Sequence, residues 1–300
     1  IQRGGINPFK ELRSLFSLWS LFRQLKPDIV HLVTIKPCLY GGIIARLVRV
    51  PCVVSAISGL GSLFIQEDFR SKFLRIILHQ VYKFAFGHHN QKIIFQNQQD
   101  AKLLMKWGVL KQENFLLIPG SGVNLNNFTQ LDERDGTMTI CFAGRLLREK
   151  GVYEFVSAAR LLKQQGIQAH FLLVGDKDLK NPSSLKDEEL KQLRDEGIVE
   201  ILGYQKNIAE IYAGSHIICL PSYREGLPKS LVEAAAASRA VVTTDVPGCR
   251  DAIIPNKSGL LVPVKDPKRL ADALQWLIEN KEKRISMGKV GRQLAEKEFE

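Results

Sequence analysis

The stretch IICLPSYREGLPKSLVEAAAASRAVVT, residues 217–243, is the clearest guide to the fold. It starts with a short apolar run, passes through a polar loop with glycine and proline, continues as a helical pattern and ends in a second apolar run. A run that is apolar at every position, rather than at alternate ones, is typical of a strand buried on both faces. The stretch therefore predicts a strand–helix–strand unit of a parallel sheet that is covered by helices.

The same alternation extends in both directions along the chain. Apolar runs predict strands at residues 28–33, 52–57, 92–96, 115–118, 139–143, 169–174, 199–202, 217–220, 240–243 and 260–262. Amphipathic patterns predict helices at residues 39–48, 69–86, 98–107, 152–165, 186–196, 207–213, 227–237 and 267–280. We therefore expect an α/β protein with two doubly wound, Rossmann-like parallel sheets, in domains of residues 1–130 and 131–300. The charged segment LDERDGT, residues 131–137, has the composition of a linker.

Length and composition exclude several classes of protein. The chain has 300 residues, of which 45% are hydrophobic and 24% are charged, so it can form packed cores and wholesale disorder is excluded. No run of ~18 apolar residues is present, so no membrane-spanning helix is expected. The five cysteines, an odd number without a C-x-x-C pair, are expected to be reduced, buried thiols. Because the chain starts at Ile1 and stops in a helical pattern, we expect a fragment whose N-terminal domain is incomplete.

Charge is distributed unevenly between the two expected domains. Residues 1–130 contain 16 Lys and Arg against 6 Asp and Glu, a net charge of +10. Residues 131–300 contain the other 26 against 25, a net charge of +1. The basic half is therefore expected to meet something anionic, such as a phospholipid surface, a phosphorylated substrate or nucleic acid.

The first candidate site is FAGRLLREKG, residues 142–151, where an expected strand ends and a helix begins. Gly144 leaves room for a ligand to approach the main chain. Arg145 and Lys150 belong to one loop and can converge on a diphosphate, the first as a fork and the second as a point charge. A solvated basic turn, with Glu149 as a local partner, explains this motif on its own equally well.

The second candidate site is SYREGLPKSLVE, residues 222–233. Glu225 is expected before a helix and Glu233 inside it, so the two carboxylates can reach hydroxyl groups at the two ends of one ligand. The free N–H groups of the helix start can hold an anion between them. The candidate donors are Gly226, Leu227, Lys229 and Ser230. Ordinary enrichment in acidic residues is the alternative, but the alanine run after Glu233 favours a packed environment for it.

Weaker candidates follow other expected strands. Gly203 leaves room for a base or sugar, and Tyr204 can stack on a base, although a core tyrosine is the commoner use. In the first domain, HLVTIKP and SGLG place polar groups near the ends of two strands, and a lone His there is more often structural. The candidates in these two motifs are His31, Lys36, Ser58 and Gly59. The chain has no G-x-G-x-x-G and no G-x-x-x-x-G-K-[ST]. It therefore lacks the sequence fingerprints of Rossmann dehydrogenases and of P-loop proteins.

The motifs of the second domain, taken in order, resemble the C-terminal half of the retaining glycosyltransferases of family 4. They are FAGRLLREKG, LLVGD, ILGY, LPSYREGLPKSLVEAAAASRAVVTTDVPGCRDAI, GLLVP and PKRLADAL, and they cover most of residues 139–280. Residues 26–65 are similar to the branch that extends polyprenyl-diphosphate-linked saccharides or builds capsule and O-antigen. The resemblance implies the GT-B fold, in which two Rossmann-like domains flank an interdomain cleft.

The resemblance also implies roles for individual residues. Arg145 and Lys150 match the pair that grips the donor diphosphate, and Glu225 matches the carboxylate that contacts the donor sugar; these three are the expected catalytic residues. Glu233 matches the carboxylate that binds the ribose hydroxyls. The other expected donor-binding residues are Gly144, Gly203, Tyr204, Gly226, Leu227, Lys229 and Ser230. Many members have a His at the position of Ser58, whereas the polyprenyl-linked branch commonly has Thr or Ser, so the role of Ser58 stays open.

The expected activity is transfer, with retention, of a hexose or N-acetylhexosamine from a nucleotide sugar, most simply a UDP-sugar, to a lipid-linked saccharide. The nucleotide sugar is a substrate, and no cofactor is expected. The family is generally metal-independent, and the D-x-D of Asp176–Asp178 is not expected to hold a metal. The acceptor is expected on the basic first domain, whose candidate residues are His31, Lys36, Ser58 and Gly59.

The excess charge of the first domain is expected to serve an anionic membrane surface and not nucleic acid, because no aromatic–basic RNA motif is present. Residues 12–25 and 69–86 have the pattern of interfacial helices, although packing onto the sheet explains the first of them at least as well. The expected location is cytoplasmic, peripheral on the inner face of the plasma membrane. The alternatives are a GT-B-like nucleotide-sugar epimerase or phosphorylase and a non-catalytic basic protein that binds membranes or nucleic acid.

Overall fold

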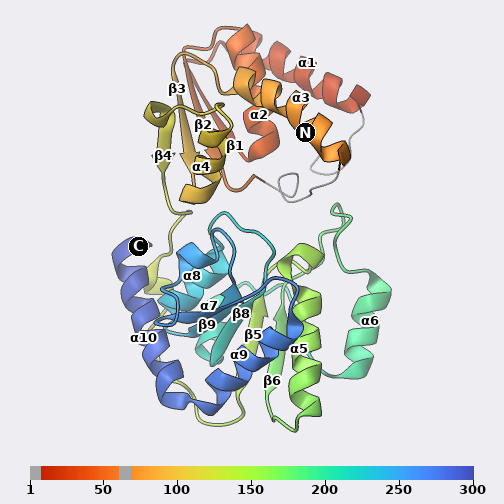
Figure 1. The fold of residues 1–300 in the computed structure, drawn as a ribbon, viewed down its shortest axis with the longest axis vertical. Helices are drawn as coiled ribbons and strands as arrows, with labels where there is room; N and C mark the ends of the chain where they lie inside the picture. Colours follow the sequence, from red (N-terminus) through yellow and green to blue (C-terminus); the bar gives the residue numbers. More distant parts are fainter. Residues whose placement is uncertain (1–7, 61–68) are drawn as a thin grey trace. The chain divides into compact units, whose positions relative to one another are not determined.

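The computed structural model describes residues 8–60 and 69–300 (Figure 1). The chain forms two compact units, Ile1–Pro119 and Gly120–Glu300. The second unit begins before the boundary expected at residue 131, because Val123, Leu125 and Phe128 are buried in its core. The apolar side chains of this segment, rather than its turn-forming composition, decide which unit it joins.

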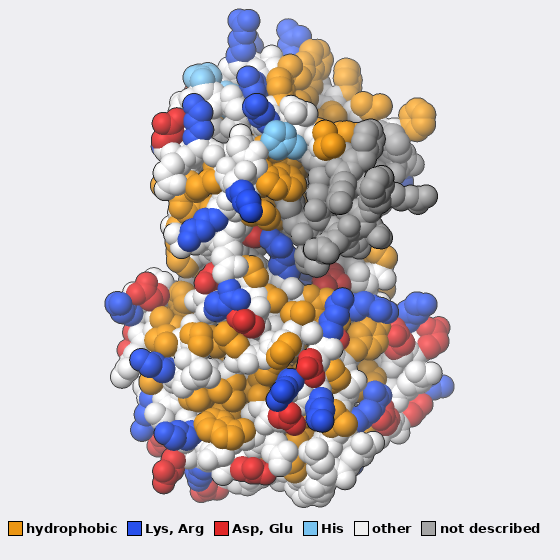
Figure 2. Space-filling model, viewed as in Figure 1, with side chains coloured by type: hydrophobic (Ala, Val, Ile, Leu, Met, Phe, Trp, Pro, Cys, Tyr) orange, Lys and Arg blue, Asp and Glu red, His pale blue; other side chains and the backbone are white. Residues whose placement is uncertain are grey.

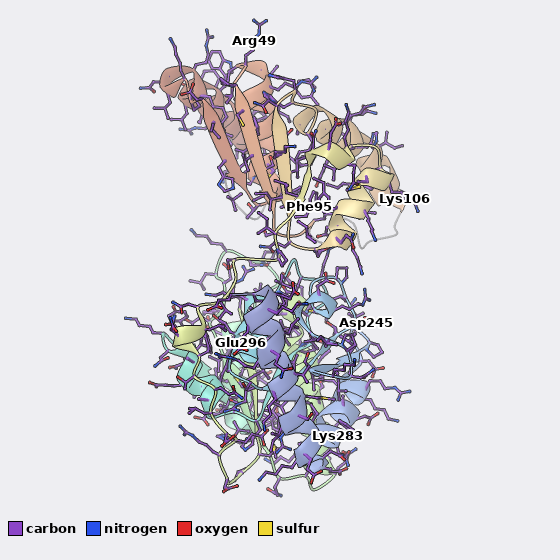
Figure 3. All side chains as sticks on the ribbon, turned by 90° about the vertical axis from the view of Figure 1, so that its left-hand side faces the viewer. Arg49, Phe95, Lys106, Asp245, Lys283 and Glu296 are labelled. Atoms are coloured by element: carbon purple, nitrogen blue, oxygen red, sulfur yellow. The ribbon has the colours of Figure 1, made fainter. Side chains whose placement is uncertain are left out.

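The first unit contains a sheet of four parallel strands in the order β1-β2-β3-β4. The strands are β1 (Ile29–Val33), β2 (Cys52–Ile57), β3 (Gln91–Phe95) and β4 (Phe115–Leu117). The helices are α1 (Pro8–Leu25), α2 (Ile35–Leu47), α3 (Phe69–Ala85) and α4 (Gln98–Lys106). Helix α2 packs against both α1 and α3. Figure 3 shows Arg49 and Phe95 near opposite ends of this sheet.

The carboxyl ends of β1 and β2 lie next to each other. Val33 of β1 pairs in register with Ala56 of β2, and the N–H of Thr34 donates to the carbonyl oxygen of Ala56 at 3.0 Å. Thr34 has a φ of 72°, which is unusual for a β-branched residue, and it turns the chain directly from β1 into α2. Ser58 follows β2 at the same edge of the sheet. Gly61, the last residue of the SGLG motif, lies outside the described residues.

The second unit contains six parallel strands in the order β10-β9-β8-β5-β6-β7. The strands are β5 (Thr139–Ala143), β6 (His170–Val174), β7 (Glu200–Gly203), β8 (Ile217–Leu220), β9 (Ala240–Thr244) and β10 (Gly259–Val262). The helices are α5 (Val152–Gln164), α6 (Asp187–Glu196), α7 (Ile208–Ala213), α8 (Lys229–Ala236), α9 (Pro267–Glu279) and α10 (Lys281–Glu298). The strand order reverses between β5 and β8, which makes this sheet doubly wound in the Rossmann manner.

Burial explains why these segments form this sheet. Strands β8 and β9 are buried at every residue, as their continuous apolar runs predict. Helix α8 carries the alanine run, and α10 packs closely against it: a Cβ at Gly288 would overlap the carbonyl oxygen of Ser238, just beyond α8. Small residues on both helices therefore let α8 and α10 pack closely together, and α8 also packs on β8 and β9.

The two parallel sheets confirm the predicted fold class, and α10 lies where the chain was expected to end in a helical pattern. The five cysteines are free and four of them are buried. Burial raises the pKa of the Cys141 thiol to about 12, as expected for a structural thiol. Within the part of the chain that the structure describes, no helix is long and apolar enough to cross a membrane.

Candidate functional site

Three loops lie side by side where β5, β6 and β7 end. The N–H of Gly144 donates to the carbonyl oxygen of Val174 at 2.9 Å, and the N–H of Gly175 donates to that of Gly203 at 2.8 Å. Gly175 has a φ of 130°, and a Cβ there would overlap the carbonyl oxygen of Gly144, so this position requires glycine. The loops can therefore approach one another at the edge where doubly wound sheets bind ligands.

A cavity of about 730 Å³ opens at this edge. Six of the predicted donor-site residues line it: Gly144, Arg145, Tyr204, Lys229, Ser230 and Glu233. They come from the loop after β5, the loop after β7 and the start of α8, which are far apart in the sequence. The fold therefore brings the predicted residues of three separate motifs to one hollow.

Gly144 forms a part of the cavity wall where no other protein atom fills the space beside the main chain. A Cβ at this position would meet its nearest protein atom, in the ring of Phe142, at 3.7 Å, which is an ordinary contact. Gly144 is also absent from the residues with positive φ. Neither the backbone nor the protein's own packing requires glycine here, in contrast with Gly175. A glycine at position 144 keeps the cavity free of a side chain.

Arg145 is held at the cavity by an acidic residue that was not among the predicted site residues. Its Nη1 lies 2.8 Å from Oδ2 of Asp178, in the loop after β6, and both residues line the cavity. The side chain of Arg145 is 51% exposed, so the guanidinium can also reach a ligand in the cavity. A guanidinium can bind two oxygens of a phosphate group as a fork.

Lys150 and Glu225 form an ion pair between Nζ and Oε1, and neither side chain belongs to the lining of this cavity. The pair joins the loop after β5 to the loop after β8, and both side chains are largely buried. Gly151 has a φ of 77°, and a Cβ there would overlap the carbonyl oxygen of Pro221. This close approach of the two loops brings together charges 75 residues apart in the sequence.

Glu233 lies in α8 and is largely buried, with 12% of its side chain exposed. Burial raises the pKa of Glu233, and Lys229, whose Nζ lies 3.3 Å from Oε1, opposes this rise. The alternative of a freely solvated surface residue is therefore wrong. A buried carboxylate with one cationic neighbour has unfilled acceptor positions, which suit hydroxyl donors from a ligand.

The segment before α8 holds the start of the helix in place. Leu227 is buried, and the carbonyl oxygen of Gly226 lies so close to Gly248 that a Cβ there would overlap it. Gly226 and Leu227 thus pack the loop and do not contribute to the cavity lining. Lys229 and Ser230 do line it, and their N–H groups, in the first turn, have no carbonyl within the helix to bond.

Tyr204 is an exposed residue of the cavity wall and not a core tyrosine. The residue is 69% exposed, and its N–H donates to Oδ1 of Asp176 at 3.1 Å. Gly203, with a φ of 66°, ends β7 and does not line the cavity. The aromatic ring is therefore available to stack on a flat ligand group.

The four acceptor-side candidates lie in the first unit. His31 is the third residue of β1 and is exposed on one face of the sheet, before the strand ends. Lys36, in the first turn of α2, has its Nζ 2.8 Å from Oε1 of Glu11 in α1. Ser58 is exposed directly after β2, and Gly59 follows it with a φ of 148°. Lys36 and Ser58 therefore share the carboxyl edge of the sheet, whereas His31 lies within it.

Several cavity residues were missed by sequence reasoning. Asp176 and Asp178 follow β6; their D-x-D was noted in the sequence only as a pair not expected to hold a metal, and neither residue was assigned to the donor. Tyr212 of α7 also lines the cavity; burial raises its pKa well above the ordinary value, and its hydroxyl has no hydrogen-bond partner among the described residues. Among residues 8–60 and 69–300, no group of three or more His, Cys, Asp or Glu side chains is arranged to hold a metal ion.

Comparison with known proteins identifies the family of the chain. Residues 124–294 match the family model described as Glycosyl transferases group 1, and residues 1–97 match Glycosyl transferase 4-like. A relative from Campylobacter jejuni, N,N'-diacetylbacillosaminyl-diphospho-undecaprenol alpha-1,3-N-acetylgalactosaminyltransferase, is 31% identical over 300 residues, which cover 96% of this chain and 77% of the relative.

Two further proteins extend the comparison. The Escherichia coli relative UDP-Gal:alpha-D-GlcNAc-diphosphoundecaprenol alpha-1,3-galactosyltransferase is 26% identical over 92% of this chain and 73% of its own length. The structure of sucrose-phosphate synthase from Thermosynechococcus elongatus superposes with a TM-score of 0.80 at 23% identity, over 98% of this chain and 76% of that one. The chain thus belongs to the group 1 glycosyl transferases and has the GT-B fold, as a glycosyltransferase built from two parallel-sheet units.

Proposed function

We propose that this glycosyltransferase moves a hexose or N-acetylhexosamine from a UDP-linked sugar to a saccharide on a polyprenyl diphosphate, in the synthesis of a cell-surface polysaccharide or glycan. The Campylobacter jejuni and Escherichia coli relatives are both named for acceptors linked to undecaprenol through a diphosphate. The Escherichia coli relative is also named for a UDP-linked donor. These names support the donor and acceptor classes of the proposal.

The observation that carries the donor assignment is the cavity shared by Gly144, Arg145 and Glu233. In the proposed complex, the diphosphate lies beside the open main chain of Gly144 and the guanidinium of Arg145. The ribose hydroxyls donate to the buried carboxylate of Glu233, and the base stacks on Tyr204. Each pairing matches a ligand group to the chemistry of the side chain that faces the cavity.

Catalysis in this proposal comes from stabilising the leaving diphosphate. Negative charge grows on it as the glycosidic bond breaks, and Arg145, Lys150 and the N–H groups at the start of α8 stabilise this charge more in the transition state than in the ground state. Glu225, which pairs with Lys150, contacts the donor sugar. Gly226, Leu227 and Gly203 shape the loops around the ligand rather than contact it, and Lys229 and Ser230 supply the helix N–H groups.

The proposal includes retention of configuration, with the acceptor hydroxyl attacking the face that the diphosphate leaves. No side chain is assigned as a covalent nucleophile. The fixed cations and the helix start supply the charge stabilisation that a divalent ion supplies in many other sugar-nucleotide enzymes. Transfer is therefore expected to continue at an unchanged rate when a chelator removes divalent ions.

The first unit supplies the acceptor side in this proposal. Lys36 and Ser58, with Gly59, lie at the carboxyl edge of its sheet, where doubly wound folds bind ligands. His31 lies within β1 and is the weakest member of the set. A saccharide presented on a membrane lipid would reach this edge from the bilayer surface.

Helix α1 supports a membrane role for the first unit. Its inner face packs on the core through residues such as Phe22, while Phe9, Leu12 and Phe16 are exposed at helical spacing on another face. Figure 2 shows hydrophobic side chains gathered over this part of the unit. An exposed apolar stripe beside cations such as Arg13 suits an anionic bilayer surface, so we place the enzyme at the cytoplasmic face of the plasma membrane as a peripheral protein.

A flotation assay with liposomes tests the membrane part of the proposal. Binding to vesicles that contain anionic lipid is expected at low salt, with weaker binding to neutral vesicles. Leu12→Ser should weaken it, and the matched variant Leu131→Ser, which alters an exposed leucine of the second unit, should not. Equal loss from both variants, or RNA binding tighter than vesicle binding, would contradict this assignment.

Nucleotide release tests the activity itself. The full chain, with any residues that precede Ile1 in the natural protein, is assayed against a panel of nucleotide sugars, with and without lipid-diphosphate saccharide acceptors. We expect UDP release that depends strictly on the acceptor. Release without acceptor would instead indicate an epimerase- or phosphorylase-like reaction on the same fold.

A further inference from the structure

Three cations that the proposed function assigns to the donor are each paired with a carboxylate, and Lys177, Lys180 and Lys206 also line the cavity. The pairs are Lys150–Glu225, Lys229–Glu233 and Arg145–Asp178. Glu225 and Glu233 have proposed ligands of their own, the donor sugar and the ribose. Asp178 has none, although it lines the same cavity as the guanidinium that is assigned to the diphosphate.

The carboxylate of Asp178 is fixed by its own turn. The N–H of Asp178 donates to Oγ of Ser184 at 2.8 Å, and its Oδ1 accepts from the N–H of Lys180 at 3.2 Å. Its carbonyl oxygen accepts from the N–H of Asn181 at 2.9 Å. The turn is tied in addition to the loop after β5, because the N–H of Leu185 donates to a carbonyl of that loop at 2.9 Å. The acidic group is therefore built into the cavity wall and cannot swing away freely.

The guanidinium of Arg145 can exchange the carboxylate of Asp178 for another acceptor. Arg145 is 51% exposed and Asp178 is 22% exposed, and ion pairs that reach solvent contribute little to stability. A phosphate oxygen can therefore replace Oδ2 of Asp178 at the guanidinium. The carboxylate stays behind in the cavity wall, where it repels the dianionic ligand.

We propose that Asp178 is an internal competitor of the donor diphosphate for Arg145, and that it weakens retention of the UDP product after transfer. The inference rests on the proposed function, in which Arg145 binds the diphosphate. Asp178 acts through Arg145 and through the charge it leaves in the cavity, and it contacts no reacting atom. It is thus a positioning residue whose removal favours binding of nucleotide.

Calorimetric titration of the full chain with UDP tests this inference. Asp178→Asn keeps an acceptor for the turn and removes the charge, so the Kd for UDP is expected to fall about threefold to fivefold, in line with the strength of partly exposed ion pairs. Inhibition of transfer by UDP should strengthen by the same factor. Asp178→Ser is the second variant, in case the amide disturbs the turn.

The matched control is Glu196→Gln, which removes one carboxylate from the exposed Arg160–Glu196 pair outside the cavity lining. It should leave the Kd for UDP unchanged. The gain from Asp178→Asn should also shrink in an Arg145→Ala background, because the competition needs the guanidinium and only the repulsion by the carboxylate then remains. A structural role for Asp178 would instead lower the unfolding temperature without this dependence on Arg145.

The outcomes separate this inference from the proposed function. If Arg145→Ala weakens UDP binding but Asp178→Asn leaves it unchanged or weakens it too, Asp178 is not a competitor and only the inference is overturned. A gain of undiminished size in the Arg145→Ala background also overturns it. If Arg145→Ala leaves UDP binding unchanged, the proposed diphosphate site is wrong and the inference falls with it.

Discussion

The two units use positive charge in different ways. In the second unit, Arg145 and Lys150 are each paired with a carboxylate, and residues 131–300 carry a net charge of only +1. In the first unit, residues 1–130 carry +10, and α1 presents Arg13 beside exposed apolar side chains. Paired cations at fixed positions select a small anionic ligand, whereas a general excess of charge attracts an anionic surface. Under the proposed function, net charge alone would therefore point to the wrong unit for the nucleotide.

The largest expected effect is a loss of stability, caused by a substitution in the segment that was predicted to be a linker and that belongs to the second unit. Glu133 accepts two hydrogen bonds from the guanidinium of Arg284 in α10, at 2.9 and 2.8 Å, and both side chains are buried. Glu133→Gln leaves a buried guanidinium without its counter-charge, so the free energy of unfolding of the second unit should fall by about 3–5 kcal/mol. Urea unfolding of the full chain measures this.

Glu196→Gln is the matched control for that experiment. It breaks a partly exposed pair with Arg160 in the same unit, and the expected cost is at most about 1 kcal/mol. Equal small losses from both variants would show that Glu133 is solvated, as its charged neighbours suggested. The segment would then belong to a linker and not to the second unit.

The next largest effect concerns activity rather than stability. Lys150→Ala or Glu233→Ala should reduce kcat/KM for transfer by about 100-fold or more, because each removes a group assigned to the donor. Lys191→Ala, which removes an exposed lysine from α6, is the control and should leave the rate unchanged. Near-native rates with both site variants would break the claim that paired charges, rather than net charge, mark the site.

A smaller effect is expected on the surface of the first unit. Arg13→Gln should weaken binding to anionic vesicles about fivefold at low salt, since one cation near such a surface contributes about 1 kcal/mol. Flotation over a salt series measures it, with Lys191→Gln as the control on the second unit. If the two variants behave alike, the difference between the units is not a difference in membrane contact.

The smallest expected effect is the pH dependence that Glu233 contributes to stability. Burial raises its pKa above the ordinary value of 4.5, so the folded protein holds this proton more strongly than the unfolded chain does. The contribution is fully present below the ordinary pKa and is lost as pH rises through the raised value. Urea unfolding of the protein and of Glu233→Gln should therefore show a difference that changes in the range just above pH 4.5. A difference independent of pH would show that the carboxylate is solvated.

The sequence predicted the elements well and the long-range pairings poorly. Continuous apolar runs indicated both parallel sheets, because a strand buried on both faces must be apolar at every position. Glu133 was taken for a linker residue because its partner Arg284 lies 151 residues further along the chain. Asp178 was passed over for the same reason, since its partner Arg145 belongs to another loop. Composition reports on local conformation, and only the fold reveals which charges meet.

The same limit applies to the candidate site. Strand-end motifs located Gly144, Arg145 and Tyr204, because a doubly wound sheet places its ligand beyond the carboxyl ends of its strands. The motifs could not show that Lys150 and Glu225 pair with each other outside the cavity lining, or that Tyr212 is buried against it. These facts depend on how closely the loops pack, which glycines such as Gly151, Gly175 and Gly248 permit.

The central claim is that the open wall at Gly144 receives the donor diphosphate, and calorimetric titration of Gly144→Ala with UDP tests it most directly. A Cβ there meets protein atoms only at ordinary contact distances, 3.7 Å or more, so the unfolding temperature should not change. The same Cβ would occupy space assigned to the ligand, and we expect the Kd for UDP to rise about tenfold or more. Unchanged UDP affinity in a variant that folds normally would contradict the account.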